Sequence, residues 1–134
     1  MDKLKAWVIA KPNFENVFRK GTAVLMVTTF VTALVGLGSD STSPAHIIAT
    51  SLFFIILGLT TTFYSLIYLL ASWSLAEDEF YELITTTSIM GDFWYNKFSK
   101  SYWLWNHRLL SIPGLLMGLL GLFVGLMKLW QYIF

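Results

Sequence analysis

The sequence predicts an all-α integral membrane protein with three transmembrane helices, and two observations carry this prediction. Hydrophobic residues make up 56% of the 134-residue chain and charged residues only 13%, against about 25% charged residues in typical globular domains. A soluble domain of this size needs a larger polar surface, so we expect the excess apolar side chains to face lipid. The second observation is the spacing of the charges, which leaves three long uncharged stretches.

The uncharged stretches place the predicted transmembrane helices. They cover residues 21–39, 41–76 and 109–127. A transmembrane helix needs about 20 largely apolar residues, so each stretch accommodates one helix, and the middle stretch is too short for two helices and a turn. The predicted spans are 21–38, 47–71 and 112–134, with an outer loop at 39–46.

Lys and Arg residues predict the orientation of the chain. Eight of the nine basic residues lie in segments 1–20 and 72–111, the loop 39–46 has none, and Lys128 is the ninth. Because Lys and Arg concentrate in short cytoplasmic flanks, we expect a cytoplasmic N-terminus and a C-terminus on the opposite side. Seven charged residues precede the first apolar stretch, a pattern that does not fit a cleaved signal peptide.

The N-terminal segment 1–20 is predicted to hold a short amphipathic helix. Phe14, Val17 and Phe18 recur at i, i+3 and i+4, the spacing of an apolar helix face. Asn13 is a suitable N-cap, because its side-chain oxygen can accept from an unpaired backbone N–H. We expect this segment to lie among the lipid headgroups, or on a partner, before the chain turns into the first span.

The connection 72–111 is predicted to be helical and cytoplasmic. Ser74 and Glu77 have the spacing of a capping box, which predicts a helix over about 75–90 that Gly91 ends. A second helix is expected from Asp92 to about residue 110, followed by the third span with Pro113 in its first turn.

In this second helix one predicted face is aromatic, and Lys97, Lys100 and Arg108 supply charge elsewhere. The residues of that face, Trp94, Phe98, Tyr102, Trp105 and Leu109, recur at helical spacing. The residues that we assign to the interface are Trp94, Phe98, Trp103, Trp105 and Arg108. Trp and Tyr are enriched where a bilayer meets water, and amphipathic helices lie in that plane. The sequence therefore predicts that the connection contacts lipid headgroups or a protein partner.

Glycines in the third predicted span form the most specific pattern in the chain. Gly114, Gly118, Gly121 and Gly125 recur at i, i+4, i+7 and i+11 and share one helix face. Helices in a bilayer associate through close backbone contact at small residues, because lipid tails are as apolar as Leu. Small residues that the other spans offer for such contact include Ala33, Gly36 and Gly58. These faces predict either packing of the three spans on one another or docking on another subunit or a second copy.

Charge, cysteine content and motifs argue against several function classes. The middle of each predicted span has no ionisable residue, and such residues mark proton relays and coupled carriers. The net charge of +1 argues against the basic surface that binds nucleic acid. The chain has no Cys, so a thiolate metal site is excluded. We expect a protein that is not an enzyme and has no cofactor and no metal. Its expected partners are membrane lipids and other membrane subunits or copies of itself, with no nucleic acid.

The two histidines and the acidic residues are also predicted to have structural roles. His46 and His107 are predicted at opposite ends of a hydrocarbon core about 30 Å thick, so one chain cannot clamp a metal or haem between them. The acidic residues at 77, 78, 79 and 82 lie at the predicted start of a helix, where the helix dipole favours carboxylates. We expect them to form a solvated helix face.

These observations favour a small non-catalytic accessory or assembly subunit of a larger membrane complex. The alternative is a homo-oligomeric pore or membrane-perturbing effector, with threonines such as Thr28, Thr32 and Thr61 facing a lumen. Thr hydroxyls in helices commonly bond to the carbonyl four residues earlier in their own helix, which argues against such a lumen. A third hypothesis, an enzyme acting on lipid through His107 and the acidic residues, lacks a catalytic pair.

Overall fold

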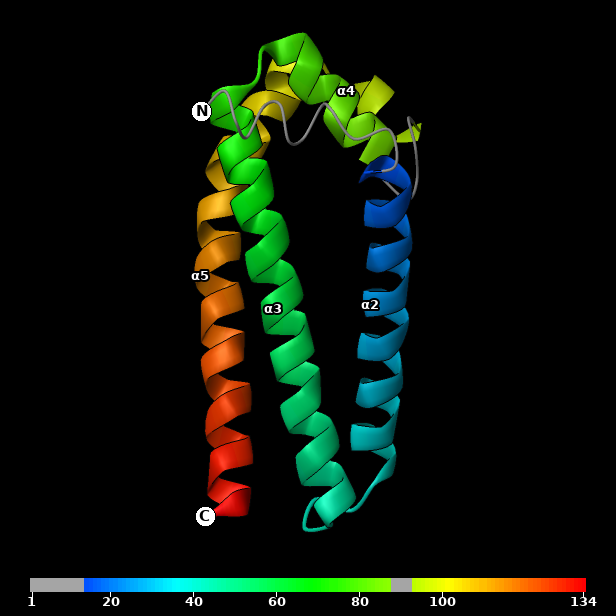
Figure 1. The fold of residues 1–134 in the computed structure, drawn as a ribbon, viewed down its shortest axis with the longest axis vertical. Helices are drawn as coiled ribbons and strands as arrows, with labels where there is room; N and C mark the ends of the chain where they lie inside the picture. Colours follow the sequence, from blue (N-terminus) through cyan, green and yellow to red (C-terminus); the bar gives the residue numbers. More distant parts are fainter. Residues whose placement is uncertain (1–13, 88–92) are drawn as a thin grey trace. The chain divides into compact units, whose positions relative to one another are not determined.

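The computed structural model describes residues 14–87 and 93–134, and every secondary-structure element in these ranges is a helix (Figure 1). The helices are α2 (Phe14–Gly38), α3 (Pro44–Ser74), α4 (Glu77–Thr87), the 3-10 helix η2 (Tyr95–Lys97) and α5 (Lys100–Ile133). Three of the described helices, α2, α3 and α5, are long and apolar enough to cross a membrane. The prediction of an all-helical chain with three helices of spanning length is confirmed.

The chain divides into two compact units, which are described separately. The first combines residues up to Ala23 with Ser65–Ile112, and we call it the aromatic unit. The second combines Val24–Tyr64 with Pro113–Phe134, and we call it the glycine unit. Helices α2, α3 and α5 each contribute residues to both units.

Helix α3 begins three residues earlier than the predicted span, at Pro44. Ser43 is its N-cap: the Ser43 hydroxyl accepts from the backbone N–H of His46 at 3.1 Å, and the Ser43 carbonyl accepts from Ile47 at 3.2 Å. Pro44 follows in the first helical position, where its missing N–H leaves no donor unpaired. A Ser-Pro pair at the end of the 39–46 loop is the signal that places this boundary.

Helix α4 has a different cap from the predicted one. Ser74 is the last residue of α3, so the proposed Ser74–Glu77 capping box is wrong. Ala76 takes the N-cap position, since its carbonyl accepts from Phe80 at 2.9 Å. The Glu79 carboxylate accepts from the Ala76 N–H at 3.2 Å, which is the half of a capping box that a Glu supplies. The predicted stop at Gly91 lies outside the described residues.

Helix α5 replaces two predicted elements with one. The expected helix from Asp92 does not include residues 94–99, because Phe98 has an extended backbone with φ −132° and ψ 162°. The helix begins at Lys100 after an N-cap at Ser99, whose hydroxyl accepts from the Tyr102 N–H at 3.2 Å. It then continues through Pro113 to Ile133, so the predicted boundary at Pro113 is not a helix end.

Helix α2 is likewise continuous, and the predicted turn between an amphipathic helix and the first span is absent from Phe14–Gly38. The proposed N-cap Asn13 lies outside the described residues, as do the side chains of Phe14, Val17 and Phe18. At its end, the Ser39 hydroxyl donates to the Val35 carbonyl at 2.6 Å. A short turn then leads to α3, closed by a Ser43 N–H to Asp40 carbonyl bond of 2.9 Å.

The aromatic unit has a hydrophobic core like that of a water-soluble domain. Phe80 and Ile84 of α4 are fully buried. They pack with Ala71, Leu75 and Leu104. Half-buried aromatic side chains surround this cluster, among them Tyr68, Tyr81, Tyr95 and Trp103. The two α4 residues account for the largest buried side chains of the described chain, so α4 anchors this unit.

The glycine unit differs from the aromatic unit in the size of the residues that it buries. Helix α3 contacts α2 at one end, where Gly36 meets Thr50, and contacts α5 along its length at Gly58, Gly118 and Gly125. In Figure 1 the three helices of this unit run antiparallel to their chain neighbours, with the C-terminus at the same end as the α2–α3 turn. Small residues are buried, whereas large aliphatic and aromatic side chains are exposed. This distribution suits helices surrounded by lipid.

Candidate functional site

The glycine face of α5 lies against α3 within the glycine unit. A Cβ added to Gly118 would stand 2.6 Å from the Thr62 backbone nitrogen, and one added to Gly125 would stand 2.8 Å from the Ile55 nitrogen. On α3, a Cβ at Gly58 would stand 2.5 Å from the Leu122 nitrogen. Real Cβ contacts are never this short, so the two backbones approach closer than any larger residue allows. We call these three glycines the α3–α5 seam.

Hydrogen atoms on the seam glycines point at oxygen atoms of the facing helix. The direction of a Cβ is that of a glycine Hα, and along it Gly58 meets the Gly118 carbonyl while Gly125 meets the Ser51 carbonyl. The Gly118 Hα points towards the Thr62 hydroxyl oxygen. Such Cα–H···O contacts recur at close helix–helix interfaces and contribute weakly, about 0.5–1 kcal/mol each.

The remaining predicted packing residues take less crowded positions. Gly121 has only ordinary van der Waals contact, with the Gly58 Cα 3.4 Å from an added Cβ. Gly114 is a half-buried residue of α5. On α2, Gly36 is buried against Thr50, and Ala33 is half-buried. Both residues line an apolar cavity between α2 and α3. Within the chain, the glycine face of α5 packs on α3. Docking of that face on another subunit or on a second copy stays a prediction.

Most threonines of the spanning helices bond within their own helix. Thr28, Thr29 and Thr60 each donate to the carbonyl four residues earlier, at 2.7–2.8 Å. Among the described residues, Thr62 has the one buried side-chain oxygen without a hydrogen-bond partner. This oxygen lies beside Gly118 in the α3–α5 seam. The threonines that bond within their own helix need no water-filled lumen to be satisfied.

The predicted interfacial residues do not lie on a single helix face. Trp94 and Phe98 precede α5, and both are exposed. Trp103 is half-buried in the aromatic unit, where its indole N–H donates to the Tyr95 carbonyl at 2.9 Å. Trp105 is exposed on α5. The predicted helical spacing was wrong because the chain is extended at Phe98.

Arg108 caps the C-terminus of α3. Its Nε and Nη2 atoms donate to the Ser72 carbonyl at 3.0 and 2.8 Å, and its guanidinium lies 4.4 Å from the Trp73 ring and 4.9 Å from the Trp105 ring. The last carbonyls of a helix lack intrahelical partners and carry the negative end of its dipole. Arg19 makes the same type of contact at the end of α4, donating to the Thr86 carbonyl at 2.8 Å.

His107 lies among aromatic rings and not in a cleft with an acid. Its ring centroid is 5.3 Å from those of Tyr68 and Phe80, and its Nδ1 donates to the Trp103 carbonyl at 2.8 Å. In the acidic cluster, Asp78 forms an exposed ion pair with Lys100. These contacts give each group a packing or capping partner.

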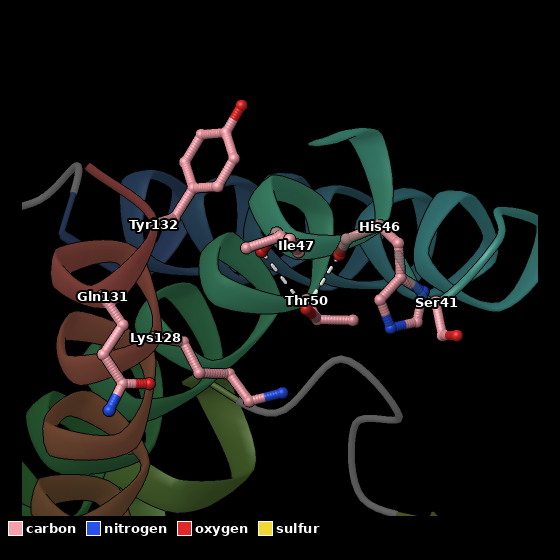
Figure 2. Close-up of a pocket in the computed structure, with 7 residues that line it drawn as sticks. All are labelled: Ser41, His46, Ile47, Thr50, Lys128, Gln131 and Tyr132. Atoms are coloured by element: carbon pink, nitrogen blue, oxygen red, sulfur yellow. Dashed lines mark hydrogen bonds between the residues drawn. The ribbon is translucent and has the colours of Figure 1, made fainter. Parts of the chain in front are cut away.

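A polar cavity of about 390 Å³ in the glycine unit was not predicted from the sequence (Figure 2). Its walls are Ser41, His46, Ile47, Thr50, Lys128, Gln131 and Tyr132. The α2–α3 turn and the first two turns of α3 form one side, and the end of α5 forms the other. Figure 2 shows the Lys128 side chain extending from α5 towards Thr50 and His46. Only the tertiary structure brings residues so distant in sequence together.

No group of three or more His, Cys, Asp or Glu side chains that could hold a metal ion occurs in residues 14–87 and 93–134. Comparisons of the chain with protein-family models, with curated proteins and with solved structures gave no match. The sites described above therefore rest on their own geometry.

Proposed function

We propose that this chain is a membrane-embedded, non-catalytic accessory or assembly subunit, which binds another membrane protein along α2. The observation that carries the proposal is the free lateral surface of that helix. Between Val24 and Leu37 only Gly36 is buried, and the large aliphatic side chains other than Leu25 are exposed. The α3–α5 seam uses small residues of the other two helices, which leaves this face of α2 open to a partner.

The composition of the exposed α2 face favours a protein neighbour over lipid alone. Val24, Val27, Val31 and Leu34 recur at i, i+3, i+7 and i+10, the spacing of a helix–helix seam. Helix association in a bilayer depends on van der Waals packing, and Val is already restricted at χ1 in a helix, so its ordering in an interface costs little entropy. The exposed face of α5 is instead rich in flexible Leu and Met.

The proposed orientation places the N-terminus and the connection between α3 and α5 in the cytoplasm, as the basic residues predict. Because the chain has no Cys, single cysteines introduced as Thr42→Cys and Ser101→Cys report sidedness without background. In intact cells, a membrane-impermeant maleimide should label Thr42→Cys alone. Ser101→Cys should react only after permeabilisation. Labelling of both variants, or of Ser101→Cys alone, would contradict the orientation.

A photoreactive amino acid at Val31 tests the partner surface in native membranes. The expected product is one adduct of fixed mass that contains a different membrane protein. The matched control is the same amino acid at Leu25, which is half-buried on the opposite side of α2 and should give no protein adduct. An adduct of twice the chain mass would support the homo-oligomer alternative, and lipid adducts alone at Val31 would contradict a subunit role.

A further inference from the structure

The polar cavity of Figure 2 adjoins an apolar cavity of about 240 Å³ between α2 and α3. His46 and Thr50 line both cavities, so a polar region and an apolar region adjoin at these two side chains of α3. The apolar end is bounded by Ala33 and Gly36 of α2 and by Phe53 and Phe54 of α3. Such a space matches an amphiphile that has one polar head and one hydrocarbon chain.

The side chains at the polar end favour a negatively charged head. Lys128 provides an ammonium group, and no described carboxylate lies within ion-pair distance of it. No acidic side chain lines the cavity. The first turn of the 31-residue helix α3 lies at the same end, and the positive end of its dipole adds to the attraction for an anion. Lys128 is exposed, and its ammonium lies 5.7 Å from the ring centroid of Phe54, which is also a wall of the apolar cavity. An anionic head at this end would therefore meet a cation that no described carboxylate neutralises.

His46 and Gln131 complete the polar end. The His46 Nδ1 lies 2.7 Å from the Gly36 carbonyl, and because a carbonyl only accepts, Nδ1 donates this bond. In the neutral ring the other nitrogen, Nε2, is then an acceptor, which can bond to a protonated oxygen of a head group but not to an ionised one. Gln131 also lines this end, and its amide carries two N–H donors; Figure 2 shows the amide turned away from the Lys128 ammonium.

We propose that this space binds an anionic amphiphile, with a phosphate or carboxylate head at Lys128 and one hydrocarbon chain between α2 and α3. The contact is a charge-assisted hydrogen bond from the Lys128 ammonium together with burial of methylene groups against Ala33 and Phe53. The site requires no second protein, so its test does not depend on the proposed subunit role.

The test uses the purified full chain in a neutral maltoside detergent and counts bound molecules by native mass spectrometry. Dodecyl phosphate is the probe, dodecylphosphocholine carries the same chain with a net neutral head, and inorganic phosphate carries the head without the chain. We expect saturable binding of one dodecyl phosphate per chain. Each of the other two compounds should bind about tenfold or more weakly. Equal binding of dodecylphosphocholine would overturn the anionic head, and equal binding of inorganic phosphate would overturn the chain groove.

Variants assign the binding to this space. Lys128→Gln should weaken dodecyl phosphate binding about tenfold or more, whereas Lys128→Arg should retain it. The matched control Lys97→Gln removes the same charge from an exposed position of the aromatic unit and should have no effect. If Lys97→Gln and Lys128→Gln weaken binding equally, the phosphate is attracted by net charge alone and the proposal is wrong.

A second pair of variants tests the hydrocarbon chain. Ala33→Phe fills the apolar cavity and should weaken dodecyl phosphate binding while leaving the weaker binding of inorganic phosphate unchanged. Leu119→Phe adds the same ring to the exposed face of α5 and should bind dodecyl phosphate as the unmodified chain does. Unchanged binding by Ala33→Phe would place the chain elsewhere and overturn the site.

Discussion

The aromatic unit and the glycine unit bury opposite kinds of side chain. In the aromatic unit the large residues Phe80 and Ile84 are inside, as the hydrophobic effect requires of a structure in contact with water. In the glycine unit Gly58, Gly118 and Gly125 are inside and the large residues are outside. This second pattern is the one expected of helices in lipid, where burying an apolar side chain gains nothing and close backbone contact drives packing. One chain thus follows two packing rules within the same three long helices.

The described arginine side chains that cap a helix end belong to the aromatic unit. In the aromatic unit, Arg108 and Arg19 donate to the last carbonyls of α3 and α4. In the glycine unit, the Ser43 hydroxyl accepts from the His46 N–H at the start of α3, and the Ser39 hydroxyl donates to the Val35 carbonyl at the end of α2. A serine cap of the same kind, Ser99, begins α5 in the aromatic unit. Long charged caps are suited to a polar environment, because a guanidinium in hydrocarbon is costly.

The largest expected effect tests whether the aromatic unit has a cooperative core. Phe80→Ala removes a fully buried ring and should destabilise the unit by about 3–5 kcal/mol, the usual cost of such a cavity. Hydrogen exchange of the α4 amides in detergent measures this loss. Phe93→Ala is the control, since Phe93 is 66% exposed, and should change stability by less than about 0.5 kcal/mol. Equal effects of the two changes would mean that α4 has no specific core.

Two alanine substitutions in one helix test the α3–α5 seam. Gly118→Ala places a Cβ against the Thr62 backbone, so the helices must separate, at a cost of about 1–3 kcal/mol. Gly121→Ala meets only ordinary contact at 3.4 Å. It should be neutral or stabilising by up to about 1 kcal/mol, because Ala favours helix over Gly. Unfolding in mixed micelles, followed by circular dichroism, measures the stability of both variants. A larger loss of stability for Gly121→Ala than for Gly118→Ala would contradict the seam geometry.

The smallest expected effect concerns the cap of α3. Arg108→Gln removes the charge that neutralises the end of this helix and should cost about 1 kcal/mol. The loss should be local, as faster hydrogen exchange in the last turn of α3. Lys97→Gln also removes one positive charge, but Lys97 stacks on exposed rings of Phe93 and Trp94 and does not cap a helix. If both changes accelerate exchange in α3 equally, Arg108 acts only through net charge.

Local signals explain which helix boundaries the sequence predicted poorly. The Ser-Pro pair at 43–44 marks the start of α3, and Ser99 marks the start of α5, but each competes with other Ser residues nearby. The Ser74–Glu77 spacing predicts a cap at Ser74, whereas in the structure the Glu79 carboxylate accepts from the Ala76 N–H. Ala is a poor N-cap by itself. The burial of Phe80 and Ile84, which requires the rest of the aromatic unit, fixes where α4 lies.

Charge spacing and composition by themselves determined that the chain has three apolar helices of spanning length. This holds because length and hydropathy are local properties of each stretch. Glycine spacing likewise determined which face of α5 is small. Only the tertiary structure decided that this face meets α3, that Arg108 ends α3, and that Lys128 and His46 share a cavity. Those pairs are distant in sequence, and their contact depends on how closely two backbones approach, which no periodicity encodes.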